Sequence, residues 1–103
     1  MSDFSLTPEA EDDLNEIWDY IARDSWRAAD RTVAKMEVEM ERLAEFPYLG
    51  TRRPAYSSEM RMRPVGRYLI FYEPRDWGVR ISRVVAADRD TDALFRKDQD
   101  SGE

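Results

Sequence analysis

Apolar residues recur with a helical period in the first half of the chain and with a strand-like period in the second half. From Pro8 to Arg23 they return every three or four positions, the spacing of a helix with one buried stripe. Thr7 is a good N-cap and Pro8 suits the first helical position. A second stripe runs over residues 29–44 and ends at Phe46-Pro47. The short link at residues 24–26, which contains Trp26, predicts an antiparallel helical hairpin.

The second half of the chain predicts a sheet. Residues 60–65 alternate arginine with apolar residues, which indicates a strand with one wet face. Residues 68–72 are continuously apolar and aromatic, which is typical of a central strand covered on both sides. Residues 79–85 form the returning strand, residues 4–6 suit a short first strand, and residues 91–95 suit a short turn of helix.

These elements predict one α+β domain over residues 1–103, ordered from about residue 3 to residue 95, with a frayed tail at residues 96–103. An N-terminal strand precedes an antiparallel two-helix hairpin, which packs on an antiparallel β-sheet meander and is followed by a short C-terminal helix.

The composition excludes several kinds of chemistry. The 103 residues include no cysteine and no histidine, which excludes disulfides, thiol nucleophiles and the usual zinc sites. We therefore expect no cofactor and no metal. The longest apolar run, residues 68–72, is far shorter than the roughly 20 residues of a membrane span. No charged-then-apolar leader opens the chain, so a cytoplasmic protein without membrane association is expected.

Charge is distributed unevenly along the chain, whose net charge is −6. Residues 9–45 carry 12 acidic and 5 basic side chains, whereas residues 51–85 carry 3 acidic and 8 basic ones. Only the middle segment can attract an anionic partner. Direct nucleic-acid binding is not expected, because the surface as a whole is acidic and non-specific affinity depends on neutralising phosphates.

The basic middle segment contains the main candidate site. Packing the helices on one sheet face would place the strand arginines together on the other face, as a cationic surface. Its members are Arg61, Arg63, Arg67 and Arg83. Arginine cannot exchange its proton near neutral pH, so this pattern favours a binding surface over an active site. The alternative is that these side chains are ordinary solvated strand residues.

Four other residues are candidate partner contacts. Trp26 and Trp77 lie in predicted turns, Val38 lies opposite the buried stripe of its helix, and Arg89 follows the last strand. Each also has an ordinary structural interpretation, because single exposed apolar residues are common on protein surfaces. The Asp88-Arg89-Asp90 run is explained equally well as a loop that caps a helix.

Several segments, taken in order, resemble the ParE-type toxins of the RelE/ParE superfamily, which are the toxic halves of type II toxin–antitoxin pairs. The similarity extends from about Leu6 to Phe95. Its carriers are residues 6–14, 17–21, 42–50, 62–72 and 81–85, with Arg89-Asp90 after them. Each segment alone is weakly specific, whereas their order and spacing together are specific.

The resemblance implies one of two activities. RelE-like members cut messenger RNA on the ribosome, and ParE-like members act on DNA gyrase. Arg61, Arg63 and Arg67 fall where the nucleases carry basic residues, but the nuclease tyrosine would fall at Leu94 or Phe95. After Val85 the chain reads Ala-Ala-Asp, with no added basic group and with alanine in place of the family's common histidine. Gyrase inhibition by binding is therefore favoured.

The resemblance also implies a ParD-like antitoxin, whose C-terminal segment wraps the toxin as a helix and adds a strand to a sheet edge. Antitoxin carboxylates would then pair with Arg61, Arg63, Arg67 or Arg83. Two alternatives stay open. One is a ribosome-dependent endonuclease in which Tyr68 or Tyr72 transfers the proton, and the other is an inactive member that only binds antitoxin.

Overall fold

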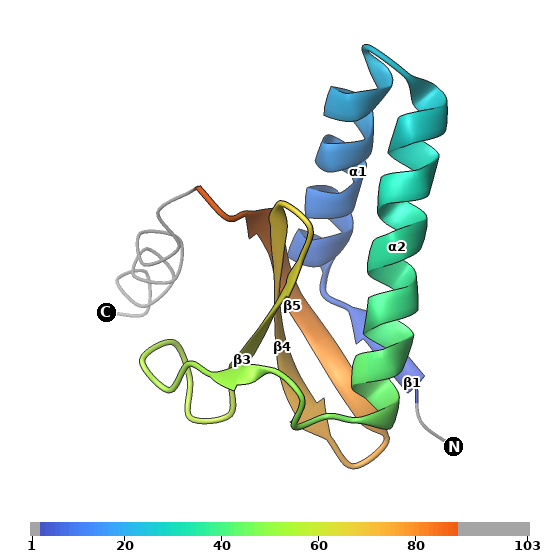
Figure 1. Ribbon diagram of the computed structural model, residues 1–103. Helices are drawn as coiled ribbons and strands as arrows, with labels where there is room; N and C mark the ends of the chain where they lie inside the picture. Colours follow the sequence, from blue (N-terminus) through green and yellow to red (C-terminus); the bar gives the residue numbers. More distant parts are fainter. Residues whose placement is uncertain (1–2, 89–103) are drawn as a thin grey trace.

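The computed structural model describes residues 3–88, in which a helical hairpin covers one face of a five-stranded sheet (Figure 1). The elements follow in the order β1 (Asp3–Leu6), α1 (Pro8–Ala22), α2 (Trp26–Glu45), β2 (Thr51–Arg52), β3 (Arg61–Val65), β4 (Tyr68–Arg75) and β5 (Gly78–Ala86). The architecture is the predicted α+β arrangement.

The sheet has the strand order β1-β5-β4-β3-β2. Strands β2 to β5 form an antiparallel meander, whereas β1 pairs with β5 in parallel, with Phe4 opposite Val79. The sheet is therefore mostly antiparallel, not wholly so. The parallel pair is possible because the helical hairpin and the meander together separate β1 from β5 along the chain.

Local sequence signals explain where the helices begin. The Thr7 hydroxyl accepts a hydrogen bond from the Ala10 N–H at 3.1 Å, and Pro8 occupies the first turn of α1. Ser25 caps α2 in the same way through the Ala28 N–H, also at 3.1 Å. Trp26 is consequently the first residue of α2 and not part of the connection. The Trp18 indole donates to Asp30 at 2.8 Å and links the two helices.

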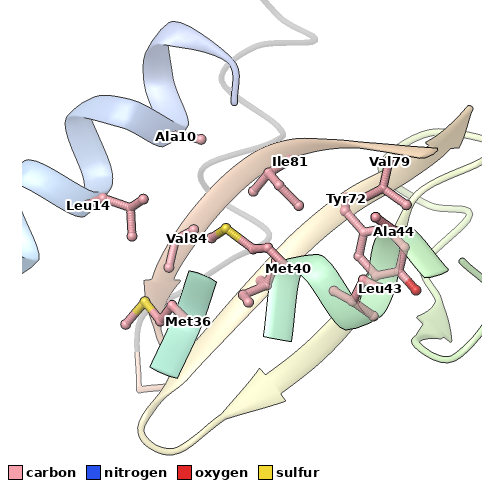
Figure 2. Packing of buried hydrophobic residues seen from close by; sticks show 11 residues of the cluster. Ala10, Leu14, Met36, Met40, Leu43, Ala44, Tyr72, Val79, Ile81 and Val84 are labelled. Carbon is pink, nitrogen blue, oxygen red and sulfur yellow. The ribbon is translucent and has the colours of Figure 1, made fainter. Parts of the chain in front are cut away.

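The main core lies between the hairpin and the sheet. Figure 2 shows α2 side chains directed at β4 and β5, with α1 contributing beside them. The fully buried residues of this cluster include Met36, Met40, Leu43, Tyr72, Val79 and Ile81. All the α2 residues in the cluster come from the half of the helix nearest its C-terminus.

A second, smaller cluster lies on the other face of the sheet. Met60, Phe71 and Val85 are buried there, and the Tyr56 ring meets the Phe71 ring edge-on with 5.7 Å between centroids. The loop before β3 supplies Tyr56 and Met60 and so covers part of this face. Strand β4 is thus buried on both sides at Ile70, Phe71 and Tyr72, as its continuous apolar run predicted.

Three sequence predictions differ from the structure or lie outside it. Residues 51–52, which lie outside the predicted strands, form the short edge strand β2. Strand β4 extends through Pro74 to Arg75, which shortens the predicted turn. The predicted helix at residues 91–95 and the candidate contact Arg89 lie outside the described residues.

Candidate partner-binding groove

The helical hairpin is longer than the sheet that it covers. Helix α2 has 20 residues, about 30 Å at 1.5 Å per residue, whereas the strands have at most 9 residues. The base of the hairpin sits on the sheet, and its tip, which includes Arg23 and Ser25, rises beyond the β3–β4 turn (Figure 1). The apolar stripe of the helices continues into this overhang without a strand beneath it.

Two adjoining hollows lie where the overhang faces the end of the sheet. Their volumes are about 490 Å³ and 540 Å³, and both are lined by Tyr20, Arg67 and Tyr68. Ile17 lines the first hollow, and Ile21 lines the second. We call the two hollows together the overhang groove. Its lining is mixed, because apolar side chains such as Ile17 and Ile21 lie beside charged ones such as Glu16 and Lys35, and such a surface suits an amphipathic helix.

The β3–β4 turn positions Arg67 and Tyr68 at this groove. Val65 pairs with Tyr68 across a two-residue turn, and Gly66 has a φ of 57°. A positive φ at the first central residue alone is the pattern of a type II′ turn, which glycine adopts without strain. The Arg67 carbonyl accepts from the Ala87 N–H at 2.8 Å, which ties the turn to the end of β5. The Arg67 side chain remains exposed.

A buried ion pair fixes α1 against β5 beside the groove. Asp13 accepts from Arg83 Nε at 2.8 Å, from Arg83 Nη2 at 3.0 Å, and from the Val84 N–H at 2.9 Å. Asp13 is 7% exposed, so its carboxylate is satisfied inside the protein. Strand β1 ends at Leu6 and therefore offers no backbone acceptor to the Val84 N–H of β5. The Asp13 carboxylate supplies that acceptor instead.

The predicted cationic surface on the far face of the sheet is wrong in its placement. Arg63 Nε binds Glu39 of α2 at 2.7 Å, so this arginine faces the helices. Arg83 binds Asp13 of α1. Arg61 donates to the carbonyls of Tyr48 and Gly50 at 3.2 and 2.7 Å, at the opposite end of the sheet from the groove. Only Arg67 of the four lines the overhang groove.

Strand register explains this correction. Arg61 and Arg63 lie opposite Tyr72 and Ile70 of β4, which point into the helix-covered core. The alternate residue Met62 therefore points to the far face, where it packs against the second cluster. In a strand that alternates arginine with apolar residues, sequence alone does not say whether the arginines or the apolar residues face the helices. The hydrophobic pattern also does not reveal the loop that covers the methionines on the far face.

The candidate contacts within the described residues are all exposed. Val38 is 65% exposed on the outer side of α2, as predicted. Trp26 is 58% exposed at the tip of the hairpin, and Trp77 is 46% exposed in the β4–β5 turn. The structure places these three side chains at separate locations, so they do not form one surface.

The tyrosines considered for proton transfer have different settings. The Tyr72 hydroxyl accepts from the Gly50 N–H at 2.8 Å and donates to the Pro47 carbonyl at 2.8 Å. Its side chain is fully buried, and burial raises the pKa of Tyr72 above its usual value, with a smaller opposing effect from the Gly50 hydrogen bond. Both hydrogen bonds of this hydroxyl therefore stabilise the fold. Tyr68 is half-buried and lines the groove.

Two further findings bear on function. Among residues 3–88, no group of three or more acidic, histidine or cysteine side chains is placed to hold a metal ion. None of the helices in that part of the chain has the length and apolar character to cross a membrane.

Sequence reasoning missed the groove residue Tyr20, and it named Tyr68 only as an alternative proton-transfer residue. The signal that could have found the groove is the length of the apolar stripe of α1. This stripe continues through Ile17 and Ile21, beyond the first half of the helix that packs on the sheet. A stripe longer than the sheet beneath it leaves an apolar surface for a partner.

Comparison with known proteins gives two results. A family model described as "ParE toxin of type II toxin-antitoxin system, parDE" matches residues 4–91. A solved structure titled "Chromosomal ParDE TA system from P. aeruginosa" has a chain with a TM-score of 0.70 and 19% sequence identity, covering 85% of this chain and 98% of that chain. At this identity the structural match supports the fold alone. Comparison with curated proteins gives no match. The family model covers most of the chain, and the chain therefore belongs to the ParE toxin family of type II toxin–antitoxin systems.

Proposed function

We propose that this chain is a cytoplasmic toxin that inhibits DNA gyrase by binding it, and that a ParD-like antitoxin neutralises it through the overhang groove. The observation that carries the antitoxin site is the groove itself. Two hollows of about 490 and 540 Å³ lie where the helices extend past the end of the sheet, with Ile17 and Ile21 of α1 in their lining. An amphipathic helix of the antitoxin would complete the layer that the sheet leaves open.

Arg67 is the residue that would pair with an antitoxin carboxylate. It lines both hollows, its side chain is exposed, and none of the ion pairs within residues 3–88 involves it. Arg63 and Arg83 already bind Glu39 and Asp13. Tyr20, with 65% of its surface exposed, would bury its ring under the same helix.

Inhibition by binding is supported by the side chains available. The sequence contains no histidine or cysteine, and arginine does not exchange protons near neutral pH. The Tyr72 hydroxyl has both of its hydrogen bonds inside the protein. Gyrase as the target rests on membership of the ParE family.

Antitoxin binding is tested by titrating the purified chain with its cognate antitoxin. Arg67→Glu should weaken binding at least tenfold, about 1.4 kcal/mol, because it places like charges across the interface. The matched control is Arg80→Glu, the same charge change at an exposed β5 position that lines neither hollow. Equal affinities for the two variants would contradict the groove.

The target is tested by following DNA and protein synthesis separately after tight induction of the chain alone. An early fall in DNA synthesis with continuing translation, together with inhibition of supercoiling by purified gyrase, supports the proposal. An early fall in translation would instead indicate ribosomal RNA cleavage. No fall in either would indicate an inactive member that binds only antitoxin.

A further inference from the structure

Four large apolar side chains are exposed in the loop after α2 and in the β4–β5 turn. Figure 1 shows both segments at the base of the hairpin, at the opposite end of the molecule from the hairpin tip. Phe46, Tyr48 and Leu49 follow α2 directly and are 54%, 73% and 38% exposed. Trp77 lies in the β4–β5 turn. Its hollow and the hollow at Tyr48 share the lining residues Pro74 and Arg75. We call the surface made by Phe46, Tyr48, Leu49 and Trp77 the base platform.

The loop that carries most of the base platform is held in place by buried groups. Tyr72, fully buried beneath it, bonds to both Pro47 and Gly50. Arg61 donates to two carbonyls of the same loop, and its guanidinium lies 5.0 Å from the centre of the Tyr48 ring. A side chain at Gly50 would lie 2.7 Å from the Tyr72 hydroxyl, so the backbone approaches as closely as glycine permits.

This rigidity matters for binding. An exposed aromatic ring on a fixed loop loses little conformational freedom when a partner covers it, and burying it yields a large apolar area. A loop that only connected α2 to β2 would need neither the aromatic ring nor the leucine on its outer side. The arrangement is that of a preorganised contact surface.

The charge around the platform indicates the partner. Two exposed arginines lie at its rim, Arg42 and Arg52, beside the acidic Glu45, Glu59 and Asp76. Within residues 3–88, no carboxylate forms an ion pair with either arginine, whereas Arg63, Arg75 and Arg83 all have such partners. Unpaired cationic side chains beside an exposed apolar surface favour a partner that places carboxylates opposite them around an apolar centre.

We propose that the base platform is the surface through which the toxin docks on its target protein, at an apolar patch with acidic neighbours. The proposal rests on the proposed function and adds to it the surface that is used. A second copy of this chain fits less well, because two copies that each carry a net charge of −6 repel one another. A nucleic acid fits less well too, because its continuous phosphates would lie against Glu45, Glu59 and Asp76, whereas a protein can place single carboxylates opposite Arg42 and Arg52 alone.

The test measures two affinities for each of four variants of the full chain. Tyr48→Ala removes the ring and Arg52→Glu reverses a rim charge. Tyr48→Phe keeps the ring, and Arg80→Glu makes the same charge change at an exposed residue that lines none of the platform hollows. We expect Tyr48→Ala and Arg52→Glu to raise the toxin concentration for half-inhibition of purified DNA gyrase at least tenfold. Antitoxin affinity should stay within threefold of the parent, and both controls should stay within threefold in both assays.

Several outcomes would overturn the inference. Parent-like inhibition by Tyr48→Ala and Arg52→Glu would show that the platform does not contact the target. An equal loss of antitoxin binding would assign the platform to the antitoxin interface. A dimer that Tyr48→Ala dissociates in sedimentation, or an oligonucleotide complex that the same change abolishes, would assign it to another partner.

Failure of the proposed function has a different signature. If the parent chain does not inhibit gyrase but still arrests growth, the target is another protein, and the platform is tested by growth arrest with the same variants. Loss of arrest in Tyr48→Ala with retained antitoxin binding then supports the platform. Unchanged arrest would overturn it.

Discussion

The two ends of the helical hairpin share an amphipathic pattern but have different surroundings. At the base, Met40 and Leu43 of α2 are fully buried against the sheet. Toward the tip, Ile17 and Ile21 of α1 carry on the same helical stripe but are only half-buried and line the overhang groove. Amphipathic pattern alone therefore does not say whether a helix face meets the protein's own core or a partner. The length of the sheet beneath the helix determines which of the two it meets.

The base end also differs in how its polar groups are satisfied. There, the Tyr72 hydroxyl bonds to Gly50 and Pro47, and Arg61 donates to the carbonyls of Tyr48 and Gly50. At the groove, Arg67 is exposed and lacks an ion-pair partner within residues 3–88. The difference separates residues that hold the fold from residues available to a partner.

The largest expected effect comes from breaking the ion pair that fixes α1 to β5. Asp13→Ala should lower the free energy of unfolding by about 3–5 kcal/mol, because it removes the carboxylate that pairs with the half-buried Arg83 guanidinium and leaves the Val84 N–H without its acceptor. Chemical denaturation measures the change. A loss below about 1 kcal/mol would mean that the pair is effectively solvated.

Two truncations test the difference between the buried base and the half-buried tip of the apolar stripe on the hairpin. Met40→Ala should cost about 2–5 kcal/mol of stability, since it opens a cavity in the main core. Ile21→Ala should cost the isolated chain less than about 1 kcal/mol, because no strand covers this residue, yet it should weaken antitoxin binding. Equal costs in the isolated chain would contradict the distinction between the two ends.

Tyr72→Phe should cost about 1–3 kcal/mol, because the buried Gly50 N–H and Pro47 carbonyl lose their partner. The change should also alter the pH dependence of unfolding. Since burial raises the pKa of Tyr72, the native state holds this proton more tightly than the unfolded state does. Its contribution is complete below about pH 10 and is lost as pH rises through the native pKa. Denaturation at pH 8 and in the alkaline range should show a smaller decline in the variant than in the parent.

The smallest effect is expected at the ion pair between β3 and α2. Glu39→Gln should cost about 0.5–1 kcal/mol, because the Arg63 side chain is 31% exposed and water can replace the lost charge partner. Raising the salt concentration should reduce the difference in melting temperature between variant and parent. A loss comparable to that of Asp13→Ala would mean that this pair is as deeply buried as the Asp13–Arg83 pair.

Most of the fold could be predicted from local signals. Thr7-Pro8 and Ser25 mark where the helices begin, and the continuous apolar run at residues 68–72 identifies the central strand. The parallel pairing of β1 with β5 could not be read in this way, because it joins residues more than 70 positions apart. The two-residue strand β2 is too short to show a period.

The site was predicted less well than the fold. Arg67 was identified as a candidate, but Arg63 and Arg83 face the helices and find acidic partners there. The choice between the two faces of β3 depends on the loop that shelters Met60 and Met62, which is a tertiary feature. Trp77 was identified as a turn residue, whereas its proximity to the loop after α2 follows only from the folded chain.

The most direct test of the account is backbone hydrogen exchange of the chain with and without its cognate antitoxin. The overhang groove predicts added protection in the second half of α1, the first half of α2 and the β3–β4 turn around Gly66 and Arg67. The loop of the base platform, residues 46–50, should exchange alike in both states. Protection confined to residues 46–50 and the β4–β5 turn, with the overhang unchanged, would contradict the assignment of the groove to the antitoxin.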